Sequence, residues 1–297
     1  SMTDRIKRTK DANGENFPVG SCLIPRELRP HVAAFYDFAR TADDIADSTE
    51  ISGDEKLERL NRLERVLLGQ EEADDETECA ETLKKSLEER GVTNQHALDL
   101  LKAFRQDSEG HHTYHTWEDV MAYCRWSAGS VGRFMLDLHG ENPTAYWPSD
   151  ALCAALQMNN HLQDCKQDYQ EKHRIYLPKD WFKDAKIKYE ALDDSQTCAA
   201  LQTVFNRVTD AIEGLLVEGS SLPLVVANRG LRMEVCVIFR LAQRLVKRLK
   251  RGDILRRKIE LKKTDWILAC LLGVAGGLRR KKISCIRKKD LKPPKKK

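Results

Sequence analysis

The stretch HVAAFYDFARTADDIAD, residues 31–47, combines a helical pattern with a set of acidic side chains. On a helix, three- and four-residue steps bring positions 36, 40, 43 and 47 to one face, so Asp43 and Asp47 stack beside Arg40. Two carboxylates one turn apart repel each other unless a cation lies between them, and Mg²⁺ is usually bound through one or two carboxylates plus phosphate oxygens. The guanidinium of Arg40 could bind the same phosphates. The alternative is a solvated acidic helix face, which is the commoner explanation of a single such motif.

A second stretch, QMNNHLQDCKQDY at residues 157–169, repeats this arrangement. Asn160, Asp164 and Asp168 follow one another at four-residue steps and would share a helix face. This polar stripe runs through an otherwise apolar helix pattern, where it costs stability, and it is therefore a candidate for function. Two facing sets of oxygen ligands could hold Mg²⁺ ions that bridge one diphosphate, and the core of a helix bundle is the usual place for such a site.

The rest of the chain also predicts helices. From Pro30 onward, apolar residues recur at helical spacing, and alternating strand patterns are nearly absent. Glycine and proline residues separate these segments and predict the connections between helices. The sequence thus predicts a single bundle of about eight or more helices, with an N-terminal extension at 1–14, one domain at 15–280 and a basic, disordered tail at 281–297. The expected helical stretches are 31–47, 55–68, 78–90, 95–105, 117–138, 150–170, 196–217 and 231–249.

Composition narrows the class of protein. With 41% hydrophobic and 32% charged residues, the 297-residue chain is expected to be globular rather than embedded in a membrane. Its longest apolar run, residues 266–278, is shorter than the roughly 20 residues that span a bilayer. The nine cysteines occur singly, which argues against a zinc site or a disulfide framework and favours the reduced cytoplasm. No secretory signal is expected from the first residues.

The basic charge is concentrated at the C-terminal end, where residues 244–297 contain 21 Lys/Arg and four Asp/Glu. These residues are mixed with Trp, Leu and Ile rather than with the stacking aromatic residues of a nucleic-acid groove, so no nucleic-acid partner is expected. The pattern instead favours peripheral contact with an anionic membrane at its inner face. The alternative is a final bundle helix followed by a solvated tail.

The quoted stretches also carry a family resemblance over most of the chain. The chain resembles the head-to-head prenyl synthases, which include squalene and phytoene synthases, and the pair ENFPVGS and YCRWSA is most similar to the hydroxysqualene synthase branch of hopanoid biosynthesis. The resemblance implies an all-α isoprenoid-synthase fold with a central active-site cavity. The matching pieces are NFPVGSCLIP (16–25), HVAAFYDFARTADDIAD (31–47), YCRWSAGSVGR (123–133), NNHLQDCKQDY (159–169) and RIYLP (174–178).

The resemblance assigns roles to individual positions. It implies an isoprenoid diphosphate substrate and Mg²⁺ as cofactor. The implied catalytic residues are Asp43, Asp47, Asp164, Asp168 and Tyr123. The implied metal ligands are Asp43, Asp44, Asp47, Asn160, Asp164 and Asp168. The implied substrate-binding residues are Phe17, Tyr36, Arg40, Ala128, Val131, Gly132, Gln157, Gln163 and Arg174.

The implied reaction is Mg²⁺-dependent ionisation of presqualene diphosphate with rearrangement and capture by water, which gives hydroxysqualene and pyrophosphate. Rings such as Phe17, Tyr36, Tyr123 and Trp126 would offer π faces to the carbocation. The absence of a G-x-G-x-x-G motif weakly favours water over a nicotinamide hydride. Two alternatives stay open: condensation of two farnesyl diphosphates to presqualene diphosphate or squalene, and a non-catalytic membrane-associated helical scaffold.

Three departures from the family pattern affect details of the site. Asn16-Phe17-Pro18 replaces a usual Ser-Phe-Tyr, Thr113-Tyr114 replaces an Arg-Tyr pair, and His161 replaces an apolar residue. His161 could alter the cavity wall or face a neighbouring helix. The cluster of His111, His112 and His115 is interpreted as a surface or helix-start feature rather than a metal site, because no cysteine or carboxylate set accompanies it.

Overall fold

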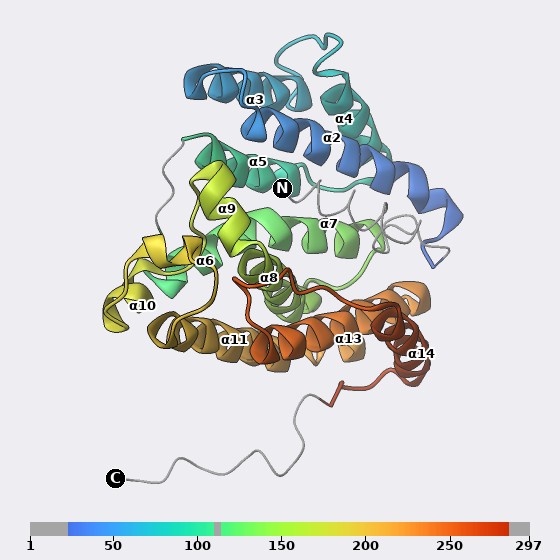
Figure 1. Ribbon diagram of the computed structural model, residues 1–297. Helices are drawn as coiled ribbons and strands as arrows, with labels where there is room; N and C mark the ends of the chain where they lie inside the picture. Colours follow the sequence, from blue (N-terminus) through green and yellow to red (C-terminus); the bar gives the residue numbers. More distant parts are fainter. Residues whose placement is uncertain (1–22, 110–113, 285–297) are drawn as a thin grey trace.

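The computed structural model describes residues 23–109 and 114–284, which form helices joined by turns and loops (Figure 1). Within these ranges there is no β-strand, and the predicted all-α fold is confirmed. The principal helices are α2 (Arg29–Asp47), α3 (Gly53–Leu67), α4 (Glu78–Arg90), α5 (Gln95–Ser108), α6 (Trp117–Cys124), α7 (Ser130–Leu138), α8 (Tyr146–Gln163), α9 (Cys165–Lys172), α10 (Lys179–Asp184), α11 (Ala199–Gly219), α12 (Leu222–Val225), α13 (Arg229–Arg251) and α14 (Lys263–Arg279).

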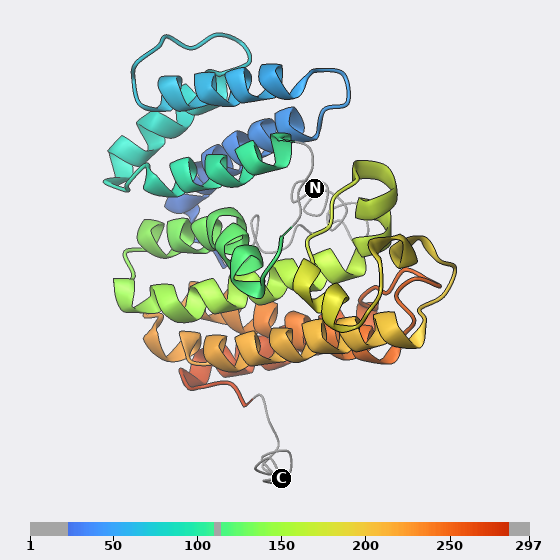
Figure 2. The same cartoon turned by 90° about the vertical axis from the view of Figure 1, so that its left-hand side faces the viewer.

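The helices surround two apolar cores. One core lies among α2, α3, α4, α5 and α7 and contains Phe35, Phe38 and Phe134, and the rings of Phe35 and Phe134 stack at 4.0 Å. The other lies among α6, α8, α11 and α13 and contains Met158, Phe205 and others. Figures 1 and 2 show these groups as layers, with α2–α5 on one side, α7 and α8 in the middle, and α11, α13 and α14 on the other. Helices α7 and α8 therefore lie between the two cores.

Helix α2 shows how local sequence places the first acidic segment. Pro30 occupies the first turn, where a missing N–H costs nothing, and Val32, Phe35, Ala39 and Ala42 form a buried stripe. The helix ends at Asp47, and Ser48 takes an extended conformation with ψ 136°. The last acid of the motif therefore lies at the very end of the helix.

Two predicted helices are interrupted. The stretch 117–138 contains a π-helical turn at Arg125–Gly129, between α6 and α7. The stretch 150–170 breaks at Asp164, whose backbone (φ −104°, ψ 8°) departs from the helix, so that α8 ends at Gln163 and α9 starts at Cys165. The four-residue steps nevertheless continue through this break, because the backbone N–H of Asp164 donates to the carbonyl of Asn160 at 2.9 Å and that of Asp168 donates to the carbonyl of Asp164 at 2.8 Å. The predicted stripe through Asn160, Asp164 and Asp168 stays a prediction.

The C-terminal part forms two helices, α13 and α14, which lie side by side at the end of the bundle (Figure 1). Among the residues that the structure describes, no helix has both the length and the apolar character needed to cross a membrane. Residues 285–297 lie outside the described ranges, as does the whole predicted N-terminal extension at 1–14. The predicted domain limits and the predicted central cavity therefore stay predictions.

Candidate active site

The first acidic segment ends in a partly buried ionic cluster. Asp43 is buried, Asp44 is exposed, and Asp47 accepts hydrogen bonds from the Nη1 of Arg174 at 2.7 Å and from the Nζ of Lys172 at 3.1 Å. Burial acts to raise the pKa of Asp47, but the positive charges of Lys172 and Arg174 outweigh it and hold that pKa below its usual value. Asp47 is thus kept ionised by its neighbours.

Arg174 joins three parts of the chain at this point. Its side chain is only 8% exposed, and its Nη2 donates to the backbone carbonyls of Asp107 at 3.0 Å and Ala46 at 3.3 Å. Burial would lower the pKa of Arg174, but the negative charge of its neighbours, including Asp107 and Asp47, raises it. The guanidinium therefore fixes the ends of α2 and α5 against the segment that follows α9.

The second acidic segment lies next to the first. Asp164 and Asp168 are buried and Asn160 is half-buried. The backbone N–H of Arg174 donates to the carbonyl of Asp168 at 3.1 Å, so the residue that contacts Asp47 also closes the turn after α9. Lys172 and Arg174 contact Asp47 directly, although they follow it in sequence by 125 and 127 positions. Arg174 therefore links the end of the first acidic segment to the end of the second, and Asp43, Asp164 and Asp168 are buried.

The donor chemistry of these segments fits Mg²⁺, because carboxylate and amide oxygens are the hard ligands that this ion prefers. In the part of the chain that the structure describes, however, no three His, Cys, Asp or Glu side chains gather closely enough to make a metal site by themselves. Mg²⁺ commonly takes one or two carboxylates and completes its shell with phosphate oxygens and water. The residues present therefore fit the ion as partial ligand sets that a diphosphate would complete.

A buried carboxyl that the sequence analysis missed lies beside this cluster. Asp107, near the end of α5, accepts hydrogen bonds from the hydroxyls of Tyr123 at 2.8 Å and Tyr176 at 2.9 Å. Burial raises the pKa of Asp107, against the opposing effects of Arg174 and of the two tyrosine hydroxyls. Asp107 falls seven residues after the buried Leu100, on the core face of α5, and a polar residue at a core position was the signal that could have revealed it.

Aromatic rings surround this carboxyl. The rings of Tyr123 and Tyr176 lie 5.3 Å apart, Tyr114 lies 5.6 Å from Tyr123, and His161 stacks on Tyr176 at 4.1 Å. Burial raises the pKa of both Tyr123 and Tyr176 well above the usual value, so both hydroxyls stay protonated and donate. His161 thus packs against the segment after α9, and the predicted Tyr123 lies within a buried aromatic cluster.

The π-helical turn at Arg125–Gly129 is held by Gln157 of α8. The Oε1 of Gln157 accepts from the backbone N–H of Ala128 at 3.1 Å, and its Nε2 donates to the Oγ of Ser127 at 2.9 Å. A π turn leaves backbone groups without regular helical partners, and such turns are frequent at functional sites. The structure therefore brings the predicted residues Ala128 and Gln157 together, with Gln157 in a supporting position.

Val131, Gly132 and Gln163 have structural partners. Val131 is buried in the core beside α2. A Cβ at Gly132 would lie 2.6 Å from the Sγ of Cys153 and 2.7 Å from the Oγ of Ser149, so glycine permits the close approach of α7 and α8. The Nε2 of Gln163 donates to the carbonyl of Ile259 at 2.6 Å and fixes the segment after α13. Packing and hydrogen bonding within the protein therefore explain why these three positions hold valine, glycine and glutamine.

The remaining predicted residues have other surroundings or lie outside the described residues. The side chain of Arg40 is 59% exposed and pairs with Asp37 at 2.6 Å. Tyr36 is half-buried, and its pKa is raised by burial and by the nearby Cys153 and Glu234. Phe17 lies outside the described residues, as do His111 and His112. The backbone N–H of His115 donates to Asp119 at the start of α6, which agrees with a helix-start position.

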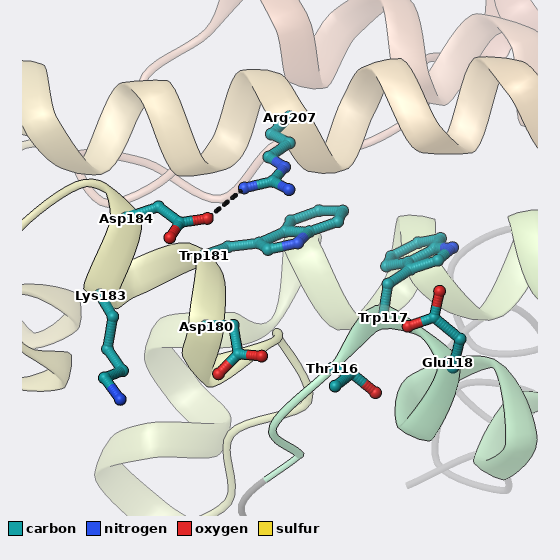
Figure 3. Close-up of a pocket in the computed structure, with 8 residues that line it drawn as sticks. All are labelled: Thr116, Trp117, Glu118, Asp180, Trp181, Lys183, Asp184 and Arg207. Carbon is teal, nitrogen blue, oxygen red and sulfur yellow. Dashed lines mark hydrogen bonds and ion pairs between the residues drawn. The ribbon is translucent and has the colours of Figure 1, made fainter.

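A separate hollow of about 520 Å³ lies between the starts of α6 and α10 and the side of α11 (Figure 3). Trp117 and Trp181 stack there at 5.1 Å, and the guanidinium of Arg207 covers Trp181 at 4.3 Å while it pairs with Asp184 at 2.8 Å. None of the residues predicted for the active site lines this hollow. Its contacts account for the packing of α10 on α11.

Comparisons with known proteins agree with this architecture. A family model described as squalene/phytoene synthase matches residues 11–265. The chain is 43% identical to a hydroxysqualene synthase of Rhodopseudomonas palustris over 91% of each chain, and 42% identical to one of Sinorhizobium fredii over 86% of each. A crystal structure of a squalene synthase from Alicyclobacillus acidocaldarius superposes with a TM-score of 0.69 at 28% identity, covering 84% of this chain and 92% of that one.

Proposed function

The chain belongs to the squalene/phytoene synthase family, and from this we propose that it converts presqualene diphosphate and water into hydroxysqualene and pyrophosphate. The carbon–oxygen bond to the diphosphate breaks, the carbocation rearranges, a water oxygen bonds to carbon, and its proton leaves to solvent or to the pyrophosphate. The observation that carries the proposal is the similarity, at 42–43% identity over most of the chain, to two hydroxysqualene synthases.

The two acidic segments supply the proposed metal site. Asp43 and Asp47 would hold Mg²⁺ from α2, with Asp44 as an exposed neighbour, and Asn160, Asp164 and Asp168 would hold it from the α8–α9 junction. When bound, Mg²⁺ supplies positive charge that neutralises the departing diphosphate. Asp43, Asp164 and Asp168 are buried, as ligands that face the interior of a helix bundle would be.

The basic residues beside Asp47 position this ligand set. Arg174 and Lys172 keep Asp47 ionised, and a carboxylate must be ionised to bind a metal. Arg174 holds that carboxylate in place through three hydrogen bonds to two segments, the end of α2 and the end of α5. A direct contact of Arg174, or of the exposed Arg40, with the diphosphate is part of the proposal and would require these side chains to exchange their present partners.

The aromatic cluster provides the environment for the cation. Tyr123 and Tyr176 are buried and fixed by Asp107, so their rings have defined positions. Ordered π faces stabilise a carbocation, and a site closed to bulk water prevents its premature capture. Tyr123 is proposed as the residue that contacts the substrate, and Asp107 is proposed as the group that orients it.

The test is a product assay with purified protein, Mg²⁺ and presqualene diphosphate, without a nicotinamide cofactor. The expected result is release of pyrophosphate and a C30 alcohol, identified by mass spectrometry. Formation of squalene only when NADPH is added, or turnover of farnesyl diphosphate but not of presqualene diphosphate, would instead support the condensing alternative. Absence of turnover with either substrate would support the non-catalytic scaffold.

Placement in the cytoplasm at the inner membrane face, with peripheral contact through residues 244–297, is also part of the proposal. The described part of this segment contains the end of α13 and all of α14. Its charge supports the contact, because the basic residues greatly outnumber the acidic ones.

A further inference from the structure

Helix α14 exposes the side chains that a bundle helix normally buries. Its buried positions are Asp265, Ala269, Gly273 and Gly277, which recur every four residues. Ile267 is 61% exposed and Leu271 is 66% exposed, on the opposite side. The exposed large apolar residues of this helix, here called the α14 outer face, are Ile267, Leu268, Leu271, Leu272, Val274 and Leu278.

Two of the buried positions, Gly273 and Gly277, allow α14 to turn this side toward α13. A Cβ at Gly273 would lie 2.7 Å from the backbone nitrogen of Val237, and a Cβ at Gly277 would lie 2.7 Å from the Cα of Met233. The backbones of α13 and α14 therefore approach so closely that no larger side chain fits between them. The large apolar side chains of α14 have no place on this side.

Polar contacts at both ends prevent the helix from turning its apolar side inward. The buried Asp265 accepts from the Nε of Arg244 at 2.9 Å and from the Nε of Arg248 at 2.7 Å. At the other end, the Nε of the buried Arg232 donates to the carbonyl of Gly277 at 2.6 Å. Rotation of α14 would break these buried interactions, so the exposure of its apolar side is built into the packing.

Positive charge borders the α14 outer face at both ends. Lys262 and Lys263 precede it, and the run from Arg279 to Lys282 follows it, all of them exposed. The one carboxylate between residues 262 and 284 is Asp265, which is buried and paired. An apolar strip between exposed cations matches the acyl chains and the anionic headgroups of a membrane surface.

We propose that the α14 outer face is a docking surface for an anionic lipid bilayer and lies in the plane of the interface. The helix is too short and insufficiently apolar to cross the membrane, which agrees with a position along the surface. A second copy of the chain fits less well, because a two-fold pairing of α14 would bring cationic ends near one another. The inference rests on the proposed membrane contact of residues 244–297 and names the surface that makes it, but it does not depend on the proposed reaction.

The test uses the full chain in co-sedimentation with phosphatidylglycerol/phosphatidylcholine vesicles and with vesicles of phosphatidylcholine alone. Wild type is expected to bind the anionic vesicles, and the triple variant Ile267→Ser, Leu271→Ser, Leu278→Ser is expected to bind at least about tenfold more weakly. Trp147→Ser, which removes a side chain that is 72% exposed on α8, is the matched control and should bind as wild type does. Thermal unfolding of each variant shows that the fold is intact.

The charge requirement has its own pair of variants. Lys281→Glu with Lys282→Glu should weaken binding to anionic vesicles at least about tenfold, since each basic residue near such a surface contributes on the order of 1 kcal/mol. Lys85→Glu with Arg90→Glu, both exposed positions on α4, should leave binding unchanged.

Several results would overturn the proposal. Equal binding by the triple variant would mean that the basic residues alone suffice, and unchanged binding by the charge-reversed pair at Lys281 and Lys282 would remove the anionic surface as partner. Failure of the wild-type protein to bind either kind of vesicle would also overturn it.

The face would be assigned to a second copy instead if the wild-type protein dimerised in analytical ultracentrifugation, the triple variant did not, and neither bound vesicles. Loss of vesicle binding with the product assay unaffected would leave the proposed reaction standing.

Discussion

Two regions of this molecule contain the same chemical unit, an aspartate held by two basic side chains, half-buried in one region and fully buried in the other. Asp47 is held by Lys172 and Arg174, and Asp265 is held by Arg244 and Arg248. Around Asp47 lie further buried acids and the tyrosines fixed by Asp107, whereas Asp265 starts a helix and accepts the backbone N–H of Lys262. A buried ion pair is therefore no sign of a catalytic site by itself, and its surroundings distinguish a ligand set from a helix anchor.

The largest expected effect is on the Asp47 side of the comparison. Arg174→Gln removes a buried guanidinium that is one of the two basic partners of Asp47 and the donor to two carbonyls. It should lower the free energy of unfolding by about 3–5 kcal/mol, as measured by urea denaturation. Arg40→Gln, in an exposed pair with Asp37, should change it by less than about 1 kcal/mol. Equal effects of the two variants would contradict the central position given to Arg174.

The second prediction separates activity from anchoring. Asp164→Asn should lower turnover of presqualene diphosphate by about 10²–10³-fold with the fold retained, since it removes one preorganised charged group from the reacting centre. Asp265→Asn should lower stability but leave turnover at low temperature near the wild-type value. Comparable turnover by the two variants, measured as pyrophosphate release, would remove the distinction drawn between the two regions.

The third prediction concerns pH and the Asp265 anchor. Burial acts to raise the pKa of Asp265, but hydrogen bonds from Arg248, Lys262 and Arg244 lower it to about 2. Since the pKa is about 3.9 in the unfolded chain, the ionised group contributes up to about 2.6 kcal/mol, fully present above pH ~5 and lost as the pH falls through about 2. The stability difference between wild type and Asp265→Asn should therefore shrink as the pH falls from 5 to 2, as followed by urea denaturation. A constant difference across this range would contradict the ionised anchor.

The smallest expected effect is at the aromatic cluster beside Asp47. Tyr176→Phe removes one of two hydroxyl donors to Asp107 and should cost about 0.5–1.5 kcal/mol of stability. If this hydroxyl helps to orient Tyr123, the variant should also lower kcat. Tyr189→Phe is the control, because Tyr189 is half-buried and lies outside this cluster. If both variants lower kcat by the same factor, the effect comes from packing and not from the orientation of Tyr123.

The helices and the acidic segments could be predicted from the sequence because they depend on local spacing. The apolar period of α2 and the Gly and Pro positions gave most element limits within a few residues, and burial of Asp43, Asp164 and Asp168 agrees with their assignment to polar stripes inside the bundle. The break at Asp164 and the π turn at Arg125–Gly129 were not predicted. The break contains neither Gly nor Pro, and the single Gly129 in the π turn is an isolated glycine of the kind that a continuous helix tolerates.

The sequence by itself determined that this chain is helical, that it carries two acidic segments, and that its C-terminal end is basic. Tertiary structure alone decided which side chains meet: Arg174 contacts Asp47 across 127 positions, Asp107 joins Tyr123 to Tyr176, and Arg40 faces the surface. It also decided that α14 buries its glycines and exposes its leucines. The physical reason is that helical periodicity arises between neighbours in the chain, whereas burial and ion pairing depend on how distant helices pack.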